Sequence, residues 1–427
     1  MSDQQHDFEV LVVGAGPAGL AAACQAAEAG KRVGIVDNSP WLGGQIWRGE
    51  EASPHDRTAQ LWIGRARKSG ATIFRSATVF AAPAKGIVMA ETPTEALTLS
   101  WGRLVIATGA RELFVPFPGW TLPGVYGPGG LHAMAKAGWP IKGKRVVVAG
   151  SGPLLLAVAD GLKQHGAVVS LVAEQAGFSD VAGFGAGLIR YPGKLLQGAG
   201  VKSRLMGVPY RFGTWVLKAE GKDSVARVVL TDGKTTRVEQ CDYLACAFHL
   251  VPNVELAQLL GCALRDGCVA VDEAQQTSVE NVFCAGEPTG VGGVDCALVE
   301  GQIAGLAVAG LEEQGSRFHR QRARWHGFRD ALNRGFSLRP ELRSLSKPDT
   351  LVCRCEDVTR GELDLHQDWR DAKLHTRCGM GPCQGRTCGA SVRYLYGWEN
   401  DSVRAPIYPV RTGSLVSQHG PENKPIT

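Results

Sequence analysis

The clearest guide to the fold is the stretch VLVVGAGPAG at residues 10–19. It begins as an apolar strand, turns on three glycines and continues into a helical pattern that ends near Ala29. A second apolar stretch, residues 32–36, follows and ends at Asp37. A strand, a glycine-rich turn, a helix and a second strand in this order are typical of a Rossmann unit that binds a dinucleotide.

Each glycine of this turn has its own task in dinucleotide binding. Gly14 permits the tight turn, Gly16 lets a pyrophosphate approach the backbone, and Gly19 lets helix and strand pack closely. Pro17 suits the first helical turn, where a missing N–H costs nothing. The N-terminus of the helix then directs N–H groups and a positive dipole end at the phosphates. Asp37 is placed to accept a hydrogen bond from a ribose hydroxyl.

Segments farther along the chain indicate FAD rather than NAD in this first unit. WLGGQ at residues 41–45 follows the second strand, LVIATGA at 104–110 closes the segment, and TSVENVFCAGE at 277–287 returns as a strand ending in an acid. This order resembles the two-dinucleotide-binding-domain flavoproteins, in which FAD lies across an N-terminal Rossmann unit and a late segment closes on the flavin end. The resemblance implies FAD contacts from Gly14, Gly16, Gly19, Asp37, Gly44, Gln45, Thr108, Gly109, Gly286 and Glu287. In that family the last acid is usually aspartate, and the longer Glu287 is expected to reach the ribityl chain.

A second glycine-rich turn differs at one position. KRVVVAGSGPLL at residues 144–155 again reads as strand, turn and helix start, and the following strand ends near Glu174. Leu155 stands where the third glycine belongs, so its branched side chain lies where helix and strand should touch. We therefore expect a Rossmann scaffold that binds no nicotinamide nucleotide. If Gly150 and Gly152 do hold one, Glu174 would favour a free 2′-hydroxyl over a 2′-phosphate.

The sequence offers no redox-active dithiol beside the flavin. Residues 41–47 contain no cysteine pair. Cys241 and Cys246 are five positions apart in CDYLACAF, which reads as a strand, and such residues face opposite sides of a sheet. We expect these two thiols to pack in the core, together with Cys24, Cys262, Cys268, Cys284 and Cys296. Disulfide reduction is therefore excluded as the activity.

The remaining five cysteines lie within 36 residues, from Cys353 to Cys388. Their pattern is CxC at residues 353–355 and CxxxxC at residues 383–388, with Cys378 between them. Clustered cysteines in a reducing compartment point to metal or redox use. Four thiolates suit a [2Fe–2S] cluster or zinc, and iron–sulfur is favoured because structural zinc sites prefer CxxC pairs.

This region resembles the small [2Fe–2S] domain of bacterioferritin-associated ferredoxin, which is fused to the C-terminal end of several oxidoreductases. The CQGxxC pattern of the fused version matches CQGRTC at residues 383–388. Carried over by position, the resemblance implies Cys353, Cys355, Cys383 and Cys388 as the ligands. Cys378 is then a packing residue.

Length, composition and charge place limits on the function. At about 150 residues per domain, 427 residues predict two to three domains. Glycine makes up 55 residues, or about 13%, against a usual ~7%, which agrees with several nucleotide-binding turns.

Residues 315–349 hold nine Lys/Arg against three Asp/Glu, which more than accounts for the net charge of +5, so nucleic-acid binding is not expected. The N-terminal residues lack the features of a signal peptide, and no apolar run reaches about 18 residues, so we expect a cytoplasmic protein without a membrane span.

The predicted fold class is α/β, with two Rossmann-like domains of the glutathione/thioredoxin-reductase kind and a small helical C-terminal [2Fe–2S] domain. The predicted parts are the first FAD-binding segment (1–115), an NAD(P)-like Rossmann domain (120–250), a second FAD-binding segment (251–310), a basic connector (311–348), the cluster domain (349–412) and a tail (413–427). The connector is expected to be a solvated helix with its aromatic residues packed inward; the alternative is a cationic docking face.

Nearly the whole chain resembles the α subunit of dye-linked amino-acid and opine dehydrogenases. The motifs that carry the resemblance are the FAD-binding turn, GSGPLLLAVA, CAGEPTGVGGVDCALVEGQIAG and TRCGMGPCQGRTC, in this order. The family includes D-hydroxyproline dehydrogenase, octopine and nopaline oxidases, and hydrogen cyanide synthase. It implies an electron-transfer subunit, with C–N oxidation in a partner subunit similar to D-amino-acid oxidase, often a small ferredoxin-like subunit, and an external electron acceptor.

The sequence agrees with this role because no segment remains that could shape a substrate-binding domain. A flavin takes two electrons as hydride and a [2Fe–2S] cluster passes one at a time, so a chain with both is suited to splitting electron pairs received from a partner. Among the possible substrates we expect D-hydroxyproline first. Two alternatives stay open: a self-sufficient NAD(P)H-dependent ferredoxin-type reductase, and a non-enzymatic iron-handling or docking protein.

Overall fold

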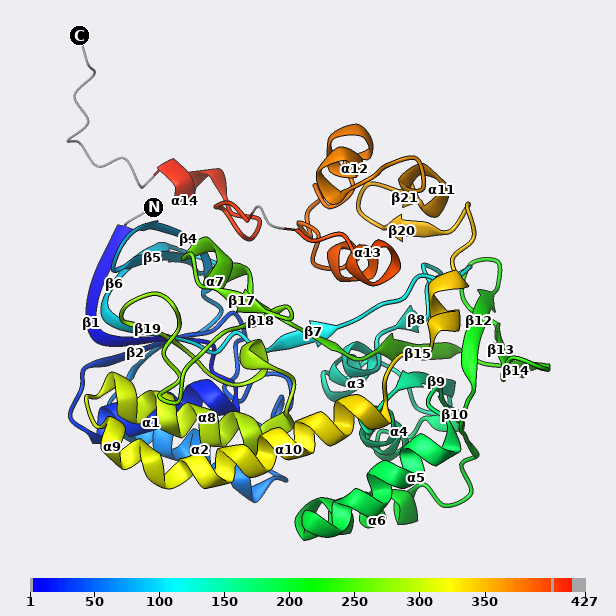
Figure 1. Cartoon of the computed structure of the whole chain (residues 1–427), viewed down its shortest axis with the longest axis horizontal. Coiled ribbons are helices and arrows are strands. Elements are labelled where there is room, and N and C mark those ends of the chain that lie inside the picture. The colour runs from blue at the N-terminus through cyan, green and yellow to red at the C-terminus, as the bar shows by residue number, and fades with distance from the viewer. Residues whose placement is uncertain (1–2, 401–402, 417–427) are drawn as a thin grey trace. The chain divides into compact units, whose positions relative to one another are not determined.

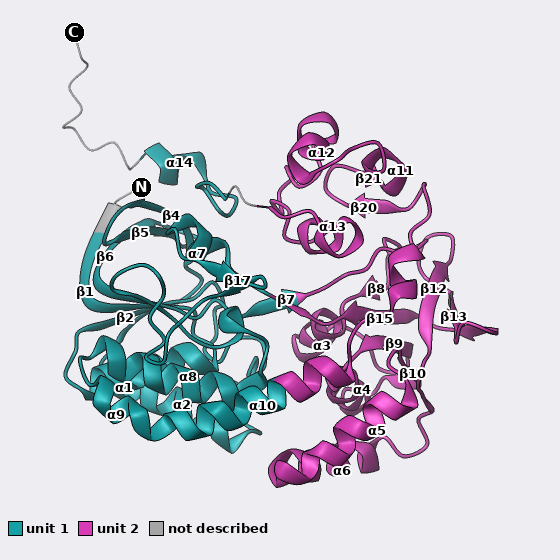
Figure 2. Ribbon diagram, in the orientation of Figure 1, with its two compact units in different colours: residues 1–111, 252–329, 402–427 teal, residues 112–251, 330–401 magenta. Residues whose placement is uncertain are grey.

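Each of the two structural units of this protein is assembled from segments that are far apart in the sequence (Figure 1, Figure 2). The computed structural model describes residues 3–400 and 403–416. The first unit comprises residues 1–111, 252–329 and 402–427, and the second comprises residues 112–251 and 330–401. The chain therefore leaves the first unit after residue 111 and returns to it at residue 252.

The first unit is organised around a seven-stranded sheet with the order β3-β2-β1-β6-β5-β4, in which β19 also pairs with β6. β1 runs parallel to β2 and β6, and β19 runs parallel to β6. The returning chain thus completes a sheet that the N-terminal residues begin. The strands are β1 (Asp3–Val13), β2 (Val33–Val36), β3 (Thr72–Phe74), β4 (Thr78–Ala84), β5 (Ile87–Glu91), β6 (Ala96–Ile106) and β19 (Val282–Cys284), with short strands β17 (Leu264–Arg265) and β18 (Cys268–Val269). Two further short strands, β7 (Ala110–Glu112) and β16 (Leu250–Pro252), include residues of both units.

Two helices of the first unit, α1 (Pro17–Glu28) and α8 (Gly293–Val308), pack against each other with very close backbones. A Cβ atom at Gly301 would lie 2.2 Å from the carbonyl oxygen of Ala18. Only glycine allows this approach, which fixes the late helix against the helix of the glycine-rich turn. The other helices are α2 (Arg57–Lys68), α7 (Glu255–Leu259), η2 (Glu287–Thr289), α9 (Glu312–Gly315), η3 (Ser316–Phe318), α10 (His319–Gly335, which ends in the second unit) and α14 (Thr412–Val416).

The second unit contains a parallel five-stranded sheet with the order β11-β10-β9-β15-β8 and a separate antiparallel sheet, β12-β13-β14. β9, β10 and β15 are rich in buried valine and alanine because both faces of the sheet are covered, one by α3 and α4 and the other by the antiparallel sheet. The strands are β8 (Val125–Tyr126), β9 (Arg145–Ser151), β10 (Val168–Glu174), β11 (Tyr210–Arg211), β12 (Trp215–Glu220), β13 (Arg227–Thr231), β14 (Thr236–Gln240) and β15 (Tyr243–Phe248). The helices are α3 (Pro128–Lys136), α4 (Leu154–Gln164), α5 (Phe178–Gly187), η1 (Leu188–Arg190) and α6 (Pro192–Arg204).

The C-terminal part of the second unit has its own small core, in which Val352, Val358, Leu363, Trp369 and Val392 are buried. It also contacts the Rossmann part of the same unit, because the Trp120 side chain donates a hydrogen bond to the Leu351 carbonyl at 2.6 Å. Its elements are η4 (Pro340–Ser344), β20 (Leu351–Cys353), β21 (Val358–Thr359), α11 (Arg360–Leu363), α12 (Trp369–Thr376) and α13 (Cys388–Tyr396).

The predicted fold class is confirmed: two parallel Rossmann-type sheets and a mainly helical C-terminal region are present. None of the helices in the described ranges, 3–400 and 403–416, is long and apolar enough to cross a membrane. In α10 the side chains of Trp325 and Phe328 are half-buried and meet edge to face with ring centroids 5.8 Å apart, whereas Arg320 and Arg324 are exposed. Residues 417–427, most of the predicted tail, lie outside the described residues.

Candidate functional site

The glycine-rich turn between β1 and α1 is built by two close backbone contacts. Gly14 has a φ of +109°, and a Cβ atom there would lie 2.2 Å from the carbonyl oxygen of Ala107. A Cβ atom at Gly19 would lie 1.8 Å from the carbonyl oxygen of Gly14. These two glycines therefore hold strand and helix together, as expected from their positions in the motif.

Gly16 differs from its neighbours because its Cβ position is open. The nearest atom to a Cβ placed there is the Gly44 Cα, at 4.0 Å, and Gly16 has an ordinary φ of −73° as the residue before α1. Gly44 packs so closely against it that a Cβ on Gly44 would lie 2.9 Å from the Gly16 Cα. Two bare backbones face one another at a helix N-terminus, which fits the pyrophosphate of a dinucleotide.

Asp37 follows β2 and binds the backbone of the same turn. One carboxylate oxygen accepts from the amide of Ala15 and the other from the amide of Ser39 at 2.7 Å. Burial raises the pKa of Asp37, although both backbone hydrogen bonds act in the opposite direction. The residue is where the sequence analysis expects it, and its contact with a ribose stays a prediction.

Thr108 and Gly109 lie after β6 and are held by Asn253. The Thr108 hydroxyl donates to the Asn253 carbonyl at 2.7 Å, and the Asn253 side-chain amide donates to the Thr108 carbonyl at 2.8 Å. The Asn253 backbone amide donates to the Gly109 carbonyl at 3.0 Å. Sequence analysis missed Asn253, because no local pattern links positions 145 residues apart. Gln45, also expected near the cofactor, is exposed and accepts from Arg48 at 2.9 Å.

Only one of the two carboxylate oxygens of Glu287 accepts a hydrogen bond from the described residues. Oε1 accepts from the amide of Gly293 at 3.0 Å, whereas Oε2 is buried and has no partner among the residues that the structure describes. Burial raises the pKa of Glu287 to about 7. A buried oxygen without a donor is rare, and a hydroxyl of the ribityl chain of FAD would satisfy it. The residues present therefore fit this cofactor.

Glu300, on α8, holds the turn that carries Glu287, and sequence analysis did not single it out. Its Oε2 accepts from the amide of Gly286 and the hydroxyl of Thr289, both at 2.8 Å. Its Oε1 lies 2.9 Å from His326 Nε2 and 3.5 Å from the Cys296 thiol. The only sequence signal is an acidic residue in the middle of a largely apolar helix. This carboxylate is fully provided with hydrogen-bond donors, so it serves to position the turn.

The second glycine-rich turn, between β9 and α4, has a different geometry. Leu155 is buried against Val146 and Val148 of β9. α4 begins at Leu154, after Pro153, whereas the corresponding Pro17 is already inside α1. The helix thus starts one position later, and Leu155 packs against the strand at the place where α1 has Gly19.

Glu174 accepts hydrogen bonds from backbone amides at this second turn. Its Oε2 accepts from the Gly152 amide at 2.7 Å and its Oε1 from the Ala176 amide at 2.9 Å. The side chain is fully buried, and burial raises its pKa to about 7. The acid after the second strand of each unit thus bonds an amide of its own glycine-rich turn, as Asp37 does with Ala15, and the Cβ position of Gly152 is open.

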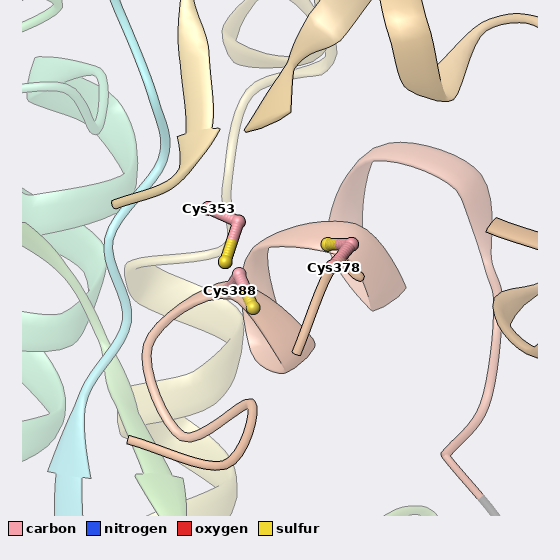
Figure 3. Close-up of side chains that lie close together, drawn as sticks. All are labelled: Cys353, Cys378 and Cys388. Atoms are coloured by element: carbon pink, nitrogen blue, oxygen red, sulfur yellow. The ribbon is translucent and has the colours of Figure 1, made fainter. Parts of the chain in front are cut away.

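The clustered cysteines meet in the C-terminal region of the second unit (Figure 3). Cys353 ends β20, Cys388 begins α13 and Cys378 follows α12, and their sulfur atoms all lie within 4.8 Å of one another. Hydrogen bonds from the Cys378 and Cys388 thiols lower the pKa of Cys353 to about 2. Cys355 and Cys383 interact with each other and lie outside this group of three. Such a set can hold an iron–sulfur centre.

The position of Cys378 differs in one respect from the prediction that it only packs in the core. It is fully buried in the small core, as a packing residue should be, yet its sulfur lies beside two of the expected ligands. The close group therefore contains two of the four expected ligands, Cys353 and Cys388, together with Cys378. The ligand set Cys353, Cys355, Cys383 and Cys388 stays a prediction.

Comparisons with known proteins agree with this geometry. Residues 8–310 match the family model described as pyridine nucleotide-disulphide oxidoreductase. The chain is 31% identical over 467 residues to the HcnB subunit of hydrogen cyanide synthase from Pseudomonas protegens, covering 96% of this chain and 99% of the relative. It is 30% identical over 461 residues to an opine oxidase subunit of Rhizobium meliloti, covering 96% and 98%.

Solved structures show the same fold. L-proline dehydrogenase from P. horikoshii has a TM-score of 0.71 at 21% identity and covers 97% of this chain and 80% of that one. Thioredoxin reductase from T. acidophilum has a TM-score of 0.55 at 23% identity, over 71% of this chain and 98% of that one. The family match spans both Rossmann units and implies FAD. The chain therefore belongs to the pyridine nucleotide-disulphide oxidoreductase family and is a flavin oxidoreductase subunit related to those of hydrogen cyanide synthase and opine oxidase.

Proposed function

We propose that this chain is the FAD- and [2Fe–2S]-containing electron-transfer subunit of a heteromeric dehydrogenase that oxidises an amino acid, an imino acid or an opine. The observation that carries the proposal is a contrast between the two dinucleotide sites. In the first unit the Cβ position of Gly16 is open and a buried Glu287 oxygen has no donor among the described residues, whereas in the second unit residues 336–339 bind at the strand ends of the Rossmann sheet. A chain with a flavin site, a thiol cluster and no usable nicotinamide site needs another source of electrons.

In this proposal the electrons come from a partner flavoprotein subunit similar to D-amino-acid oxidase, which breaks the C–H bond next to nitrogen. FAD supplies two-electron chemistry when bound, and a [2Fe–2S] cluster supplies one-electron transfer. The relatives support a nitrogen-bearing substrate, because opine oxidase is among their names. We propose D-hydroxyproline as the first substrate to test. The further partners in this proposal are a small ferredoxin-like subunit and an external electron acceptor, and the location is the cytoplasm.

The roles of this chain's own residues follow from their geometry. Gly16 and Gly44 keep the backbone bare for the pyrophosphate, and Glu287 offers its free oxygen to the ribityl chain. Glu300 positions the Glu287 turn. We assign the cluster to Cys353, Cys355, Cys383 and Cys388.

The test is purification of the tagged chain from its native host, followed by identification of the co-purifying chains and measurement of flavin and iron. D-Hydroxyproline, L-proline and octopine are then offered to the complex and to the isolated chain with an artificial dye. We expect dye reduction by the complex and none by the isolated chain. The proposal fails if the isolated chain reduces the dye with an amino acid as fast as the complex does, or if it contains no flavin.

A further inference from the structure

The place where a second dinucleotide would bind in this chain is the crevice at the carboxyl ends of β9, β10 and β15. Open parallel sheets bind ligands outside the carboxyl ends of their strands, where the strand order changes direction. In the second unit that point lies between β9 and β15, because the chain passes from β9 outward to β10 and later returns to β15 on the other side. Ser151 ends β9, Gln175 follows β10, and His249 follows β15.

Residues 336–339, which follow α10, bind to all three of these strand ends. The Phe336 carbonyl accepts from the Ser151 hydroxyl at 3.1 Å and from His249 Nε2 at 2.6 Å. The Gln175 side chain spans the next residues: its amide nitrogen donates to the Ser337 carbonyl at 3.1 Å, and its oxygen accepts from the Arg339 amide at 3.0 Å. Three main-chain groups of one short segment are thus recognised by side chains of the crevice.

The side chains of the same segment are packed as well. Phe336 is 2% exposed, and its ring meets that of Phe184 edge to face with centroids 5.1 Å apart. The Arg339 guanidinium lies 4.5 Å above the ring of Trp215 and donates to the Gln175 carbonyl at 3.3 Å. The segment is therefore held in the crevice by its main chain and by its side chains.

The neighbouring turn resembles the first one. The Gly152 amide donates to Glu174 as the Ala15 amide donates to Asp37, and a Cβ atom at Gly152 would meet nothing within 4 Å. The obstacle to a second dinucleotide is therefore the chain segment bound in the crevice, residues 336–339.

We propose that residues 336–339 are the resident occupant of the second Rossmann crevice, bound there in place of a pyridine nucleotide, and that the crevice serves to seat the cysteine-rich region. The Tyr394 hydroxyl, on α13, donates to the Arg339 carbonyl at 3.1 Å. Since α13 begins at Cys388, the bound segment connects the crevice to the helix of a proposed cluster ligand. This inference concerns the second unit alone and goes beyond the proposed function.

The binding of residues 336–339 in the crevice can be tested by hydrogen exchange. The exchange is measured by mass spectrometry on the full purified chain with its cofactors. In the wild type the Arg339 amide should exchange slowly. Gln175→Ala removes the acceptor of that amide and the donor to Ser337, so exchange in peptides covering residues 337–342 should rise by roughly tenfold or more. Peptides of α13 should also exchange faster. Gln164→Ala is the matched control, because Gln164 bonds Asp160 on its own helix, at 3.1 Å, and it should change neither peptide.

Adding a pyridine nucleotide tests whether residues 336–339 already occupy the crevice. Addition of NADH or NADPH at a concentration of about 1 mM, the upper end of ordinary substrate affinities, should protect neither residues 150–153 nor residues 174–176 in the wild type. It should also leave exchange at residues 337–342 unchanged. Protection of the turn by either nucleotide would overturn the proposal. Rapid exchange of the Arg339 amide in the wild type would also overturn it. So would an exchange rate in α13 peptides that Gln175→Ala does not change. None of these readouts depends on dehydrogenase activity, so a failed substrate test leaves them intact.

Discussion

At Gly16 a side chain would fit the protein but not its ligand. Its φ is −73°, and a Cβ would have no neighbour nearer than 4.0 Å, so Gly16→Val should fold. The valine methyl groups would enter the space of the pyrophosphate, and we expect a loss of at least about tenfold in FAD affinity. Flavin absorbance per chain after gel filtration, with the melting temperature as a check of folding, measures this.

The matched control for that variant is Gly64→Ala. Gly64 lies on α2 with nothing within 4 Å of its Cβ position, so FAD content should not change. A folded Gly16→Val protein with full FAD would refute the placement of the cofactor on the first turn.

Glu174 should make stability depend on pH. Its pKa is raised from 4.5 to about 7 by burial, so the folded chain binds a proton that the unfolded chain has released. Stability from this group is present below pH 4.5 and is lost as the pH rises through about 7, with a slope of up to about 1.4 kcal/mol per pH unit. Glu174→Gln cannot ionise, so its melting temperature should fall less than that of the wild type between these pH values. Exposed Glu312→Gln should follow the wild type; parallel curves for Glu174→Gln would disprove the assignment.

At the scale of elements, the contact between α1 and α8 connects the two distant halves of the FAD site. Gly301→Ala would place a Cβ 2.2 Å from the Ala18 carbonyl, a backbone atom that can yield only if a helix shifts. We expect a loss of about 1–3 kcal/mol in unfolding free energy and weaker FAD binding, because the shift moves the N-terminus of α1. Urea denaturation with and without added FAD checks both effects. Gly183→Ala on α5, where a Cβ meets nothing within 4 Å, is the control, and equal stability of both variants would contradict the packing argument.

The elements of the C-terminal region bring the thiols of Cys353, Cys378 and Cys388 together. Substitution of single cysteines can show which thiols bind the cluster and which only pack in the core. Cys383→Ser should lose the iron and the electron paramagnetic resonance signal of the reduced protein while it keeps FAD, since the flavin residues belong to the other unit. Cys378→Ser should keep its iron, although its sulfur lies close to those of Cys353 and Cys388. Zinc in the wild type, or loss of the cluster from Cys378→Ser with retention in Cys383→Ser, would overturn the ligand assignment.

For the whole molecule, we expect the isolated chain not to oxidise NADH or NADPH. Leu155 stands in place of the third glycine of the turn, Glu174 takes the amide of Gly152, and residues 336–339 bind along the crevice. Anaerobic mixing with either nucleotide should leave the flavin absorbance unchanged over minutes, whereas dithionite should bleach it. Steady turnover with an artificial acceptor would show that these features do not block the second site.

Much of the fold could be predicted because its signals are local. A strand, three glycines and a helix occupy adjacent positions, and the physical demands of a tight turn fall on those same positions, as Gly14 and Gly19 show. The cysteine spacing is similarly local within each pair. Leu155 indicated a changed turn for the same reason, since a branched side chain replaces a contact that only glycine permits.

The remaining features depend on contacts between residues that are distant in the chain. Asn253 reaches Thr108 across 145 positions, and Gln175 binds the Arg339 amide across 164. Neither pair has any periodicity or spacing that a single sequence could display, because the partners are brought together by the order of strands in a sheet. Local backbone chemistry thus made the class of cofactor readable from the residues alone. Folding in three dimensions placed Glu300 beneath the Glu287 turn, set Cys378 among the thiols and filled the second crevice with the chain's own backbone.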